Sequence, residues 1–248
     1  IYIHIPFCKQ ACRYCDFHFS TNLKKKDEMV LALAKEIEMR KSEFQDEIVE
    51  TIYFGGGTPS ILQIADLKFL IDAVYKNYKV VENPEITVEA NPDDLTENRI
   101  IELSNNKVNR LSIGIQSFFE DDLQLMNRAH NVEEAKKCLE IATHYFDNIS
   151  IDLIYGVPEM SNEKWLQNIE TALSFGVPHI SSYALTVEPK TALHSFIQKG
   201  IIPQPDDEVA QEHFQILVDK LSENGFIHYE LSNFGKENFF SKNNSSYW

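Results

Sequence analysis

Three cysteines stand close together near the start of the chain, at Cys8, Cys12 and Cys15. They follow an apolar run directly, so their thiols share one short loop. Three thiolates can bind three irons of a [4Fe–4S] cubane, whereas a cluster held entirely by protein uses four ligands. In catalytic zinc sites the missing protein ligand marks the position where chemistry occurs. The spacing therefore predicts a metal centre with one open coordination position.

The spacing alone leaves two other uses of these thiols open. His18 would complete a Cys3His zinc set of structural type, and two of the thiols could instead form a disulfide. The fourth cysteine, Cys138, lies within a helical pattern and is expected to be a buried helix residue rather than a ligand. Surface or core positions, not ligation, are also expected for His144, His194 and His213.

A glycine-rich turn, Gly-Gly-Gly-Thr-Pro at residues 55–59, follows another apolar run. Glycines allow positive φ and close approach of the main chain to a ligand. No Gly-Lys-Ser or Gly-Lys-Thr follows, so the turn is not a phosphate loop. One strand after the cysteines, it would instead lie beside an amino-acid moiety.

Strand-like runs alternate with helix-like runs along the chain. The strand candidates are residues 1–5, 51–54, 85–89, 110–115, 149–155 and 179–185. Apolar residues at helical spacing mark residues 28–44, 65–78, 97–104, 121–127, 132–145, 162–175 and 207–224. Asp66, Thr96 and Ser161 suit helix N-caps, and Gly176 and Gly225 suit helix ends.

Repeated strand–helix units predict a parallel sheet with helices outside it, either open or closed into a barrel. Specialised residues accompany all six strand candidates. Cys8 and the glycine turn follow the first two, Glu89 and Gln116 end the next two, Asp152 and Tyr155 lie along the fifth, and Tyr183 lies near the end of the sixth. An open sheet gathers ligands at one switch point, whereas every strand of a barrel ends at the same mouth. The sequence therefore predicts an α/β fold, a partial (β/α)6 TIM-like barrel.

The composition indicates a globular protein of the cytoplasm. The chain has 248 residues and a formal net charge of −15, which disfavours nucleic acid as a partner. No run of eighteen apolar residues could span a membrane. Few cysteines in a chain of this length argue against a disulfide scaffold and for a reducing compartment.

The ends of the sequence suggest a piece of a longer protein. The chain opens on an apolar run at Ile1 without an initiator methionine. Residues 235–248 are rich in Lys, Asn and Ser and end abruptly at Tyr247 and Trp248. We expect a core over residues 1–234, and over 235–248 a linker or the start of a further segment.

Several motifs occur together in a fixed order. They are Tyr-Ile-His-Ile-Pro-Phe-Cys at residues 2–8, the cysteine triplet with Tyr14 and Phe17, the glycine turn, Glu-Ala-Asn-Pro at 89–92, Gly-Ile-Gln-Ser-Phe at 114–118, Asn-Arg-Ala-His at 127–130, and residues 152–158. The chain closely resembles the radical SAM family of oxygen-independent coproporphyrinogen III oxidases and their relatives, the HemW-type heme chaperones. The resemblance covers essentially the whole chain and implies the partial barrel, a [4Fe–4S] cluster on Cys8, Cys12 and Cys15, and S-adenosylmethionine (SAM).

The resemblance also implies roles for matching residues. Tyr2 would contact SAM at the cluster, and Gly56, Gly57 and Thr58 would line SAM. Polar or further contacts to SAM would come from Glu89, Gln116, Arg128, Asp152 and Ala184. Taken singly, two of these residues have simpler alternatives: Glu89 could cap a turn, and Arg128 could pair with Glu120 or Asp121.

Two positions separate the branches of the family. The oxidase branch has a fourth cysteine where this chain has Phe17, so the triplet resembles the chaperone branch. That branch tends to carry a His-Asn-x-x-Tyr-Trp motif implicated in heme contact, and here Asn243 stands in place of the histidine. Asparagine cannot replace imidazole as an iron ligand.

The resemblance implies binding of heme and its delivery to a heme-dependent protein partner. The alternative within the family is SAM-dependent oxidative decarboxylation of coproporphyrinogen III, and a remote one is a zinc-stabilised binding module. A radical SAM enzyme acting on RNA is disfavoured by the −15 charge. The oligomeric state is not encoded in these motifs.

Overall fold

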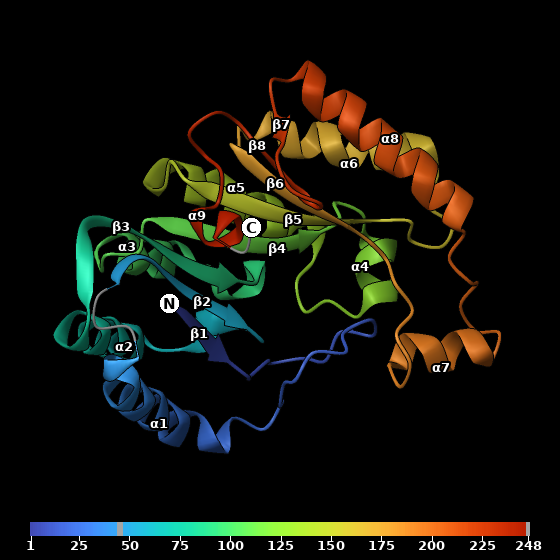
Figure 1. Cartoon of the computed structure of the whole chain (residues 1–248). Helices are drawn as coiled ribbons and strands as arrows, with labels where there is room; N and C mark the ends of the chain where they lie inside the picture. Colours follow the sequence, from blue (N-terminus) through green and yellow to red (C-terminus); the bar gives the residue numbers. More distant parts are fainter. Residues whose placement is uncertain (44–46, 247–248) are drawn as a thin grey trace.

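The computed structural model describes residues 1–43 and 47–246, and its centre is one curved eight-stranded sheet (Figure 1). The strand order is β1-β2-β3-β4-β5-β6-β8-β7; β1 to β6 pair in parallel in chain order, and β8 is antiparallel to both β6 and β7. The strands are β1 Tyr2–Ile5, β2 Ile48–Gly56, β3 Lys79–Ala90, β4 Arg110–Gln116, β5 Ile149–Tyr155, β6 His179–Ala184, β7 Ile227–His228 and β8 Asn233–Gly235.

Most helices lie outside this sheet (Figure 1). They are α1 Lys26–Met39, α2 Ile64–Asn77, α3 Glu97–Ser104, α4 Glu120–Met126, α5 Val132–Tyr145, α6 Asn162–Ser174, α7 Ala192–Gln198, α8 Asp207–Glu223 and α9 Lys242–Ser245. The predicted α/β fold with six parallel strands is confirmed as a partial barrel, and the antiparallel pair β8 and β7 extends its far edge.

The sheet has two chemically different faces because side chains alternate along each strand. The apolar series on the convex face packs under the helices and is buried: Ile3, Phe54, Val88, Ile113, Ile151 and Ile180. Their neighbours on the concave face are mostly polar. Parallel register sets Glu89 beside Ser112, Ser112 beside Ser150, and Asp152 beside Ser181. The same strands therefore build a hydrophobic core on one side and a polar interior on the other.

Several helix ends follow from local chemistry. Thr96 and Ser161 are N-caps as predicted, and Gly176 and Gly225 follow helices at positive φ of 71° and 78°. The predicted N-cap at Asp66 is wrong. Gln63 is the N-cap of α2, and the Asp66 carboxylate accepts from the Gln63 backbone N–H at 3.1 Å. The acidic residue therefore completes a capping box from within the first turn.

Other boundaries differ from the sequence analysis. Helix α1 ends at Met39 and continues as a 3-10 turn over Arg40–Ser42, and the predicted end at Phe44 lies outside the described residues. Helices α7 and α9 were not predicted, since each is short and carries little amphipathic pattern.

The segment that was expected to be a linker packs against the sheet over its described part. Gly235 belongs to β8, and α9 lies on the concave side (Figure 1). The Glu85 carboxylate, 6% exposed, accepts from the backbone N–H groups of Lys242 and Asn243 at 3.4 and 3.3 Å. Tyr247 and Trp248 lie outside the described residues. The division at residue 234 stays a prediction.

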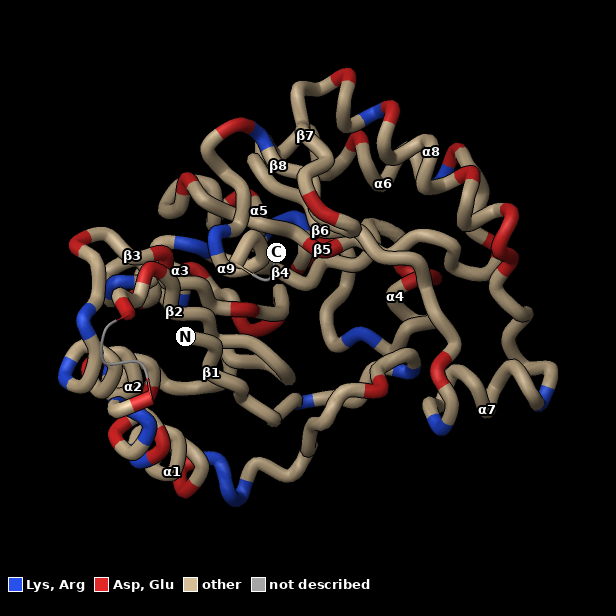
Figure 2. The backbone as a smooth tube through the Cα atoms, viewed as in Figure 1, with Lys and Arg blue, Asp and Glu red and all other residues tan. Residues whose placement is uncertain are grey.

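Acidic residues occur along the outer helices, for example along α8 (Figure 2). No helix in the described part of the chain is both long and apolar enough to cross a membrane. The cytoplasmic location and the absence of a nucleic-acid partner stay predictions.

Candidate functional site

The three clustered cysteines lie on the loop that leaves β1. Their side chains are half-buried, and all four cysteines of the chain are free thiols, so the disulfide alternative is wrong. Backbone hydrogen bonds hold the loop: Cys8 N–H donates to Ser20 O at 3.1 Å, and Arg13 N–H donates to Met126 O at 3.0 Å. Burial raises the pKa of the Cys8 and Cys15 thiols. A neighbouring cation would favour the thiolate form that binds metal.

Arg128 supplies that cation. Its Nη1 donates to Cys12 Sγ and to the Tyr14 hydroxyl, both at 3.3 Å. Its Nη2 donates to Asn91 Oδ1 at 2.7 Å and to Gly114 O at 2.9 Å, while its buried Nε has no protein partner. The positive charge is thus fixed beside the cysteine loop.

The simpler alternative for Arg128 is wrong. Asp121 pairs with Lys164 at 2.8 Å, and a Glu120 carboxylate oxygen accepts from Val132 N–H at 2.8 Å. The chain turns away from these acids before Arg128, because Asn127, the C-cap of α4, has a left-handed backbone (φ 57°). The turn directs the guanidinium toward the sheet instead.

Asn91 joins elements that the sequence analysis did not connect. Besides accepting from Arg128, its Nδ2 donates to Thr58 Oγ1 at 3.4 Å, which links the β4–α5 region to the glycine turn. Nearby, Lys9 forms ion pairs with Asp93 and Asp94, and the Ser60 hydroxyl donates to Asp94 at 2.6 Å. The cysteine loop, the glycine turn and the end of β3 are therefore tied together.

The glycine turn lies directly behind the start of the cysteine loop. Gly57 N–H donates to Ile5 O at 2.8 Å, and a Cβ at Gly57 would lie 2.6 Å from Phe7 O. Gly56 has φ 110°, a conformation that favours glycine. Thr58 contacts Cys8 through its hydroxyl. The glycines are required because two backbone segments meet here.

Glu89 lies at the carboxyl end of β3, in contact with that turn. It accepts from the Tyr53 hydroxyl at 2.8 Å and from Gly56 N–H at 3.1 Å. Tyr2 stacks on Tyr53 with 5.8 Å between ring centroids. Burial raises the pKa of Glu89, and its two hydrogen bonds oppose that shift. Glu89 therefore does hold a turn, and it also borders the interior of the barrel.

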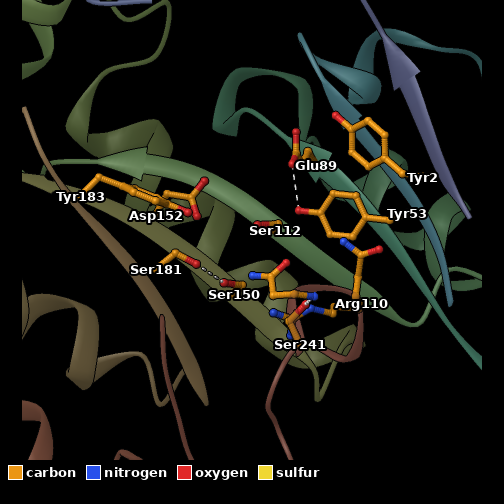
Figure 3. Close-up of a pocket in the computed structure, with 12 residues that line it drawn as sticks. Tyr2, Tyr53, Glu89, Arg110, Ser112, Ser150, Asp152, Ser181, Tyr183 and Ser241 are labelled. Atoms are coloured by element: carbon orange, nitrogen blue, oxygen red, sulfur yellow. Dashed lines mark hydrogen bonds between the residues drawn. The ribbon is translucent and has the colours of Figure 1, made fainter. Parts of the chain in front are cut away.

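The concave face encloses a cavity of about 220 Å³ (Figure 3). Glu89 and Asp152 line it toward the carboxyl ends of the strands, and Arg110 lines it at the amino end of β4. Burial, and then repulsion from Glu89, raises the pKa of Asp152 to about 7. Asn243 also lines the cavity and is only 6% exposed.

The remaining predicted residues lie at strand ends. Gln116 ends β4 with φ 68°, and its side-chain amide and the Arg128 guanidinium both lie over Gly114, where a Cβ would be 2.9 Å from one and 3.1 Å from the other. Ala184 ends β6 and pairs in register with Tyr155. The structure thus brings Arg128, Gln116 and Cys12 together in one group, and Tyr2, Gly56 and Glu89 in another. Asp152 lines the cavity, and Ala184 lies at the end of β6.

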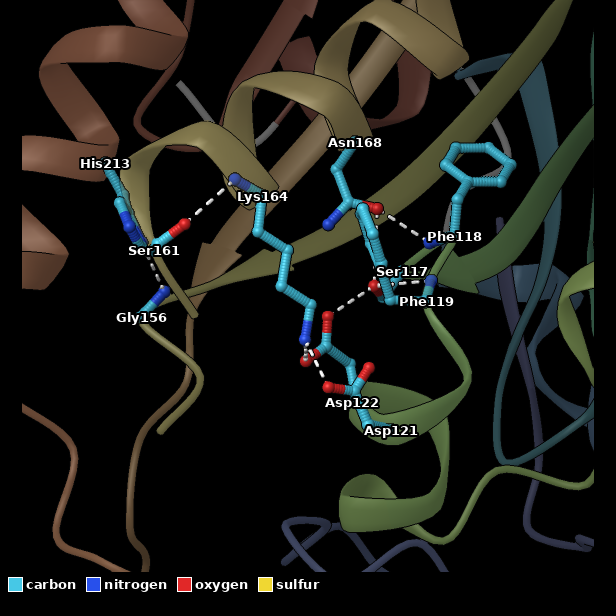
Figure 4. A network of polar contacts seen from close by, with 10 residues as sticks. All are labelled: Ser117, Phe118, Phe119, Asp121, Asp122, Gly156, Ser161, Lys164, Asn168 and His213. Carbon is cyan, nitrogen blue, oxygen red and sulfur yellow. Dashed lines mark hydrogen bonds and ion pairs between the residues drawn. The ribbon is translucent and has the colours of Figure 1, made fainter. Parts of the chain in front are cut away.

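Directly after Gln116, a buried polar network anchors the chain to α4 and α6 (Figure 4). The Ser117 hydroxyl donates to Asp122 at 2.7 Å, and Lys164 Nζ pairs with the same carboxylate at 2.6 Å. Asn168 Oδ1 accepts from Phe118 N–H at 2.6 Å. These contacts keep the turn after β4 in one conformation.

Residues outside this group behave as expected. Cys138 is buried on α5, His144 is exposed, and His213 is buried, where its Nδ1 accepts from Gly156 N–H at 3.1 Å. Sequence reasoning missed Asn91, Tyr53 and Arg110. Strand alternation could have indicated Tyr53 and Arg110, since both stand at inward positions.

The donor set fits an iron–sulfur cluster better than one zinc ion. In the described residues, no three or more His, Cys, Asp and Glu side chains converge on a single ion position. A cubane needs no such convergence, because each thiolate binds a different iron. The thiols lie on one loop beside the Arg128 cation, whose buried Nε has no protein partner. These features fit an anionic cluster and a polar ligand next to it.

Comparisons with known proteins agree with this site. Residues 2–172 match the Radical SAM superfamily. The chain is 38% identical to a protein of Bacillus subtilis (strain 168) and 35% identical to one of Lactococcus lactis subsp. lactis (strain IL1403), each named heme chaperone HemW. All of this chain is covered in both, but only 66% and 65% of those proteins.

A solved structure of Escherichia coli coproporphyrinogen III oxidase (HemN), described as a radical SAM enzyme, superposes with a TM-score of 0.84 at 26% identity. The superposition covers 96% of this chain and 55% of that one. The chain therefore spans less than two thirds of the proteins it matches. The match over residues 2–172 shows that the chain belongs to the radical SAM superfamily, whose cofactors are a [4Fe–4S] cluster and SAM.

Proposed function

We propose that this chain is the radical SAM part of a heme chaperone, which binds heme and delivers it to a heme-dependent partner protein. The observation that carries the proposal is the match of the whole of this chain to about two thirds of relatives named heme chaperone HemW. Phe17 supports it, because the oxidase branch has a cysteine at that position. Phe17 is 70% exposed on the cysteine loop.

In this proposal Cys8, Cys12 and Cys15 would hold the cluster, and SAM would bind beside it. When bound, the cluster supplies reductive cleavage of the SAM sulfonium. Arg128 stabilises negative charge at the cysteine loop, since its guanidinium is held 3.3 Å from Cys12 Sγ. The remaining SAM contacts would come from Tyr2, Gly56, Gly57, Thr58, Glu89, Gln116, Asp152 and Ala184.

Anaerobic reconstitution with iron and sulfide tests the cluster. The wild-type chain should develop the broad visible absorption of a [4Fe–4S] cluster, and Cys12→Ala should lose it. Cys138→Ala is the matched control, because that thiol is buried on α5 away from the loop. A wild-type chain that takes up zinc instead, and no cluster, would contradict the proposal and favour the zinc-stabilised module.

The volume of the cavity favours a heme site outside the barrel. Its value of about 220 Å³ is below the ~300–1,000 Å³ of sites for drug-sized ligands. Asn243 faces this cavity, and its amide is no iron ligand. Heme titration of the wild-type chain and of Asn243→His should give saturable binding with defined stoichiometry. Absence of saturable binding in both proteins would reject heme as cargo.

The second candidate function is oxidation of coproporphyrinogen III, favoured by the structural match at TM-score 0.84. An anaerobic assay with SAM, a reductant and coproporphyrinogen III separates the two. The chaperone proposal expects no decarboxylated product, whereas turnover comparable to that of a known oxidase would replace it.

A further inference from the structure

Arg110 is a buried cation that forms no ion pair in the described part of the chain. It is 2% exposed, and its Nη1 donates to Asn148 Oδ1 while its Nε has no protein partner. Buried charges in proteins are normally paired, because removing an ion from water is costly. An arginine that retains an open donor inside the fold therefore needs another explanation than core packing.

The open side of Arg110 is the cavity. Its side chain lines the cavity together with three serines of the concave face, Ser112, Ser150 and Ser181 (Figure 3). The first of these lies two residues along β4, and Ser150 pairs with it in register on β5. The Thr87 hydroxyl, in register with Arg110 on β3, is also buried without a partner. The Arg110 guanidinium and the Ser112 hydroxyl thus lie together in the cavity lining, whereas the hydroxyls of Ser150 and Ser181 are hydrogen-bonded to His179 and Asn233.

The ends of the cavity carry opposite charge. Glu89 and Asp152 stand nearer the carboxyl ends of the strands, whereas Arg110 begins β4. The amino end is closed by α9, whose Asn243 lines the cavity and whose backbone is held by Glu85. Burial of this end lowers the local dielectric constant, which strengthens an electrostatic contact there.

We propose that the Arg110 guanidinium, together with the Ser112 hydroxyl, binds a carboxylate at the amino end of the cavity. Arginine presents a planar fork that matches a carboxylate with two parallel hydrogen bonds. The volume of about 220 Å³ admits a small monocarboxylic acid or the carboxylate arm of a larger molecule. This inference goes beyond the proposed heme delivery and does not depend on it.

The probes are sodium propionate and its neutral isostere propionamide, added to the anaerobically reconstituted protein at constant ionic strength. Propionate should bind saturably and raise the thermal midpoint, and propionamide should bind at least about tenfold more weakly. Arg110→Met should lower propionate affinity at least about tenfold. Without propionate, Arg110→Met should unfold at the same or a higher temperature, because it removes an unpaired buried charge.

Arg99→Met is the matched control, since Arg99 is largely buried elsewhere, donates to Leu62 O and pairs with Glu102. It should leave propionate affinity unchanged. If Arg110→Met does not fold, Arg110→Lys and Ser112→Ala should each weaken binding several-fold, since one loses the fork and the other a hydroxyl. Competition with heme then identifies the natural ligand of the site. If heme displaces propionate, the carboxylate belongs to the cargo; if heme does not displace it, the ligand is a separate small acid.

Equal binding of propionate and propionamide would overturn the proposal, and so would wild-type affinity in the Arg110 variants. A loss of stability in Arg110→Met of the same size with and without propionate would indicate a purely structural arginine. None of these results bears on heme titration, so failure here and failure of the heme proposal remain distinguishable.

Discussion

The two faces of the sheet are made by the same strands but have different roles. On the convex face Ile151 and Ile180 are fully buried beneath the helices. One residue further along each strand, Asp152 and Ser181 line or border the cavity on the concave face. The convex face is packed with apolar groups, and the concave face holds charged groups that are poorly compensated.

This difference shows that residues that stabilise the fold and residues that line the cavity are neighbours along the same strand. Complete burial of an aliphatic side chain contributes about 1.5–3 kcal/mol to the free energy of folding. A buried carboxylate or guanidinium without an ion pair instead destabilises the folded state. Substitutions on the two faces should therefore have opposite signatures.

The largest expected effect comes from the adjacent pair Ile151 and Asp152. Ile151→Ala should reduce the free energy of unfolding by about 2–5 kcal/mol, because it opens a cavity in a fully buried position. Near pH 4, where the buried Asp152 carboxyl is still protonated, Asp152→Asn should change the free energy of unfolding by less than about 1 kcal/mol. The same variant should weaken SAM binding at least about tenfold. Urea denaturation and calorimetric titration of the reconstituted protein measure both. A similar loss of stability in the two variants would break the comparison.

The second prediction concerns an exception, a polar network on the helix-covered side (Figure 4). Asp122 is 2% exposed and is paired with Lys164. Lys164→Met should cost about 3 kcal/mol of unfolding free energy, because it leaves a buried carboxylate without its cation. Lys35→Met, which breaks an exposed pair with Glu38, should cost less than about 1 kcal/mol.

The double variant Lys164→Met with Asp122→Asn serves as the internal check in the same denaturation series. It should recover part of the lost stability, since no unpaired charge remains. Additive losses from the two substitutions would show that the network, not the charge pair, carries the stability.

Much of the fold was predictable because it rests on repeated local patterns. Six apolar runs predicted the parallel strands, and polar residues at their carboxyl ends predicted one shared mouth. The glycine turn was predicted to approach a ligand, which stays a prediction. The structure shows that Gly57 also approaches the backbone of Phe7. Such features need only neighbouring residues to specify them.

Other features depend on contacts between distant segments and left no local signal. Helix α9 has four residues, and Glu85, more than 150 positions earlier, holds its amino end. Composition therefore predicted a linker. Asn91 likewise joins Arg128 to Thr58 only after three strands have come together. The assignment of individual residues to SAM stays a prediction.

The third prediction uses the raised pKa of Asp152, about 7 in the folded state against an ordinary value of 3.8. Between these values the folded protein binds more protons than the unfolded chain, so the free energy of unfolding falls as pH rises. Its slope for this group reaches about 1.4 kcal/mol per pH unit and ends above pH 7.

The measurement is the difference in stability between Asp152→Asn and wild type at a series of pH values from 4 to 8. The stability of the variant relative to wild type should rise with pH up to about pH 7 and stay constant above it. Asp72→Asn, on the exposed side of α2, is the control and should show no such trend. A flat difference for Asp152→Asn would mean that the cavity does not penalise its charge.

The smallest expected effect comes from two adjacent serines on β6. Ser182 Oγ is buried on the convex face without a partner, whereas Ser181 Oγ on the concave face donates to Asn233 Oδ1 at 2.7 Å. Ser182→Ala should be neutral or stabilising by up to about 1 kcal/mol, because the hydroxyl is desolvated without compensation. Ser181→Ala should cost about 1 kcal/mol, because Asn233, 4% exposed, loses a donor. Urea denaturation of both variants resolves the sign. If Ser182→Ala destabilised the chain more than Ser181→Ala, the polar groups of the two faces would not differ in the way proposed.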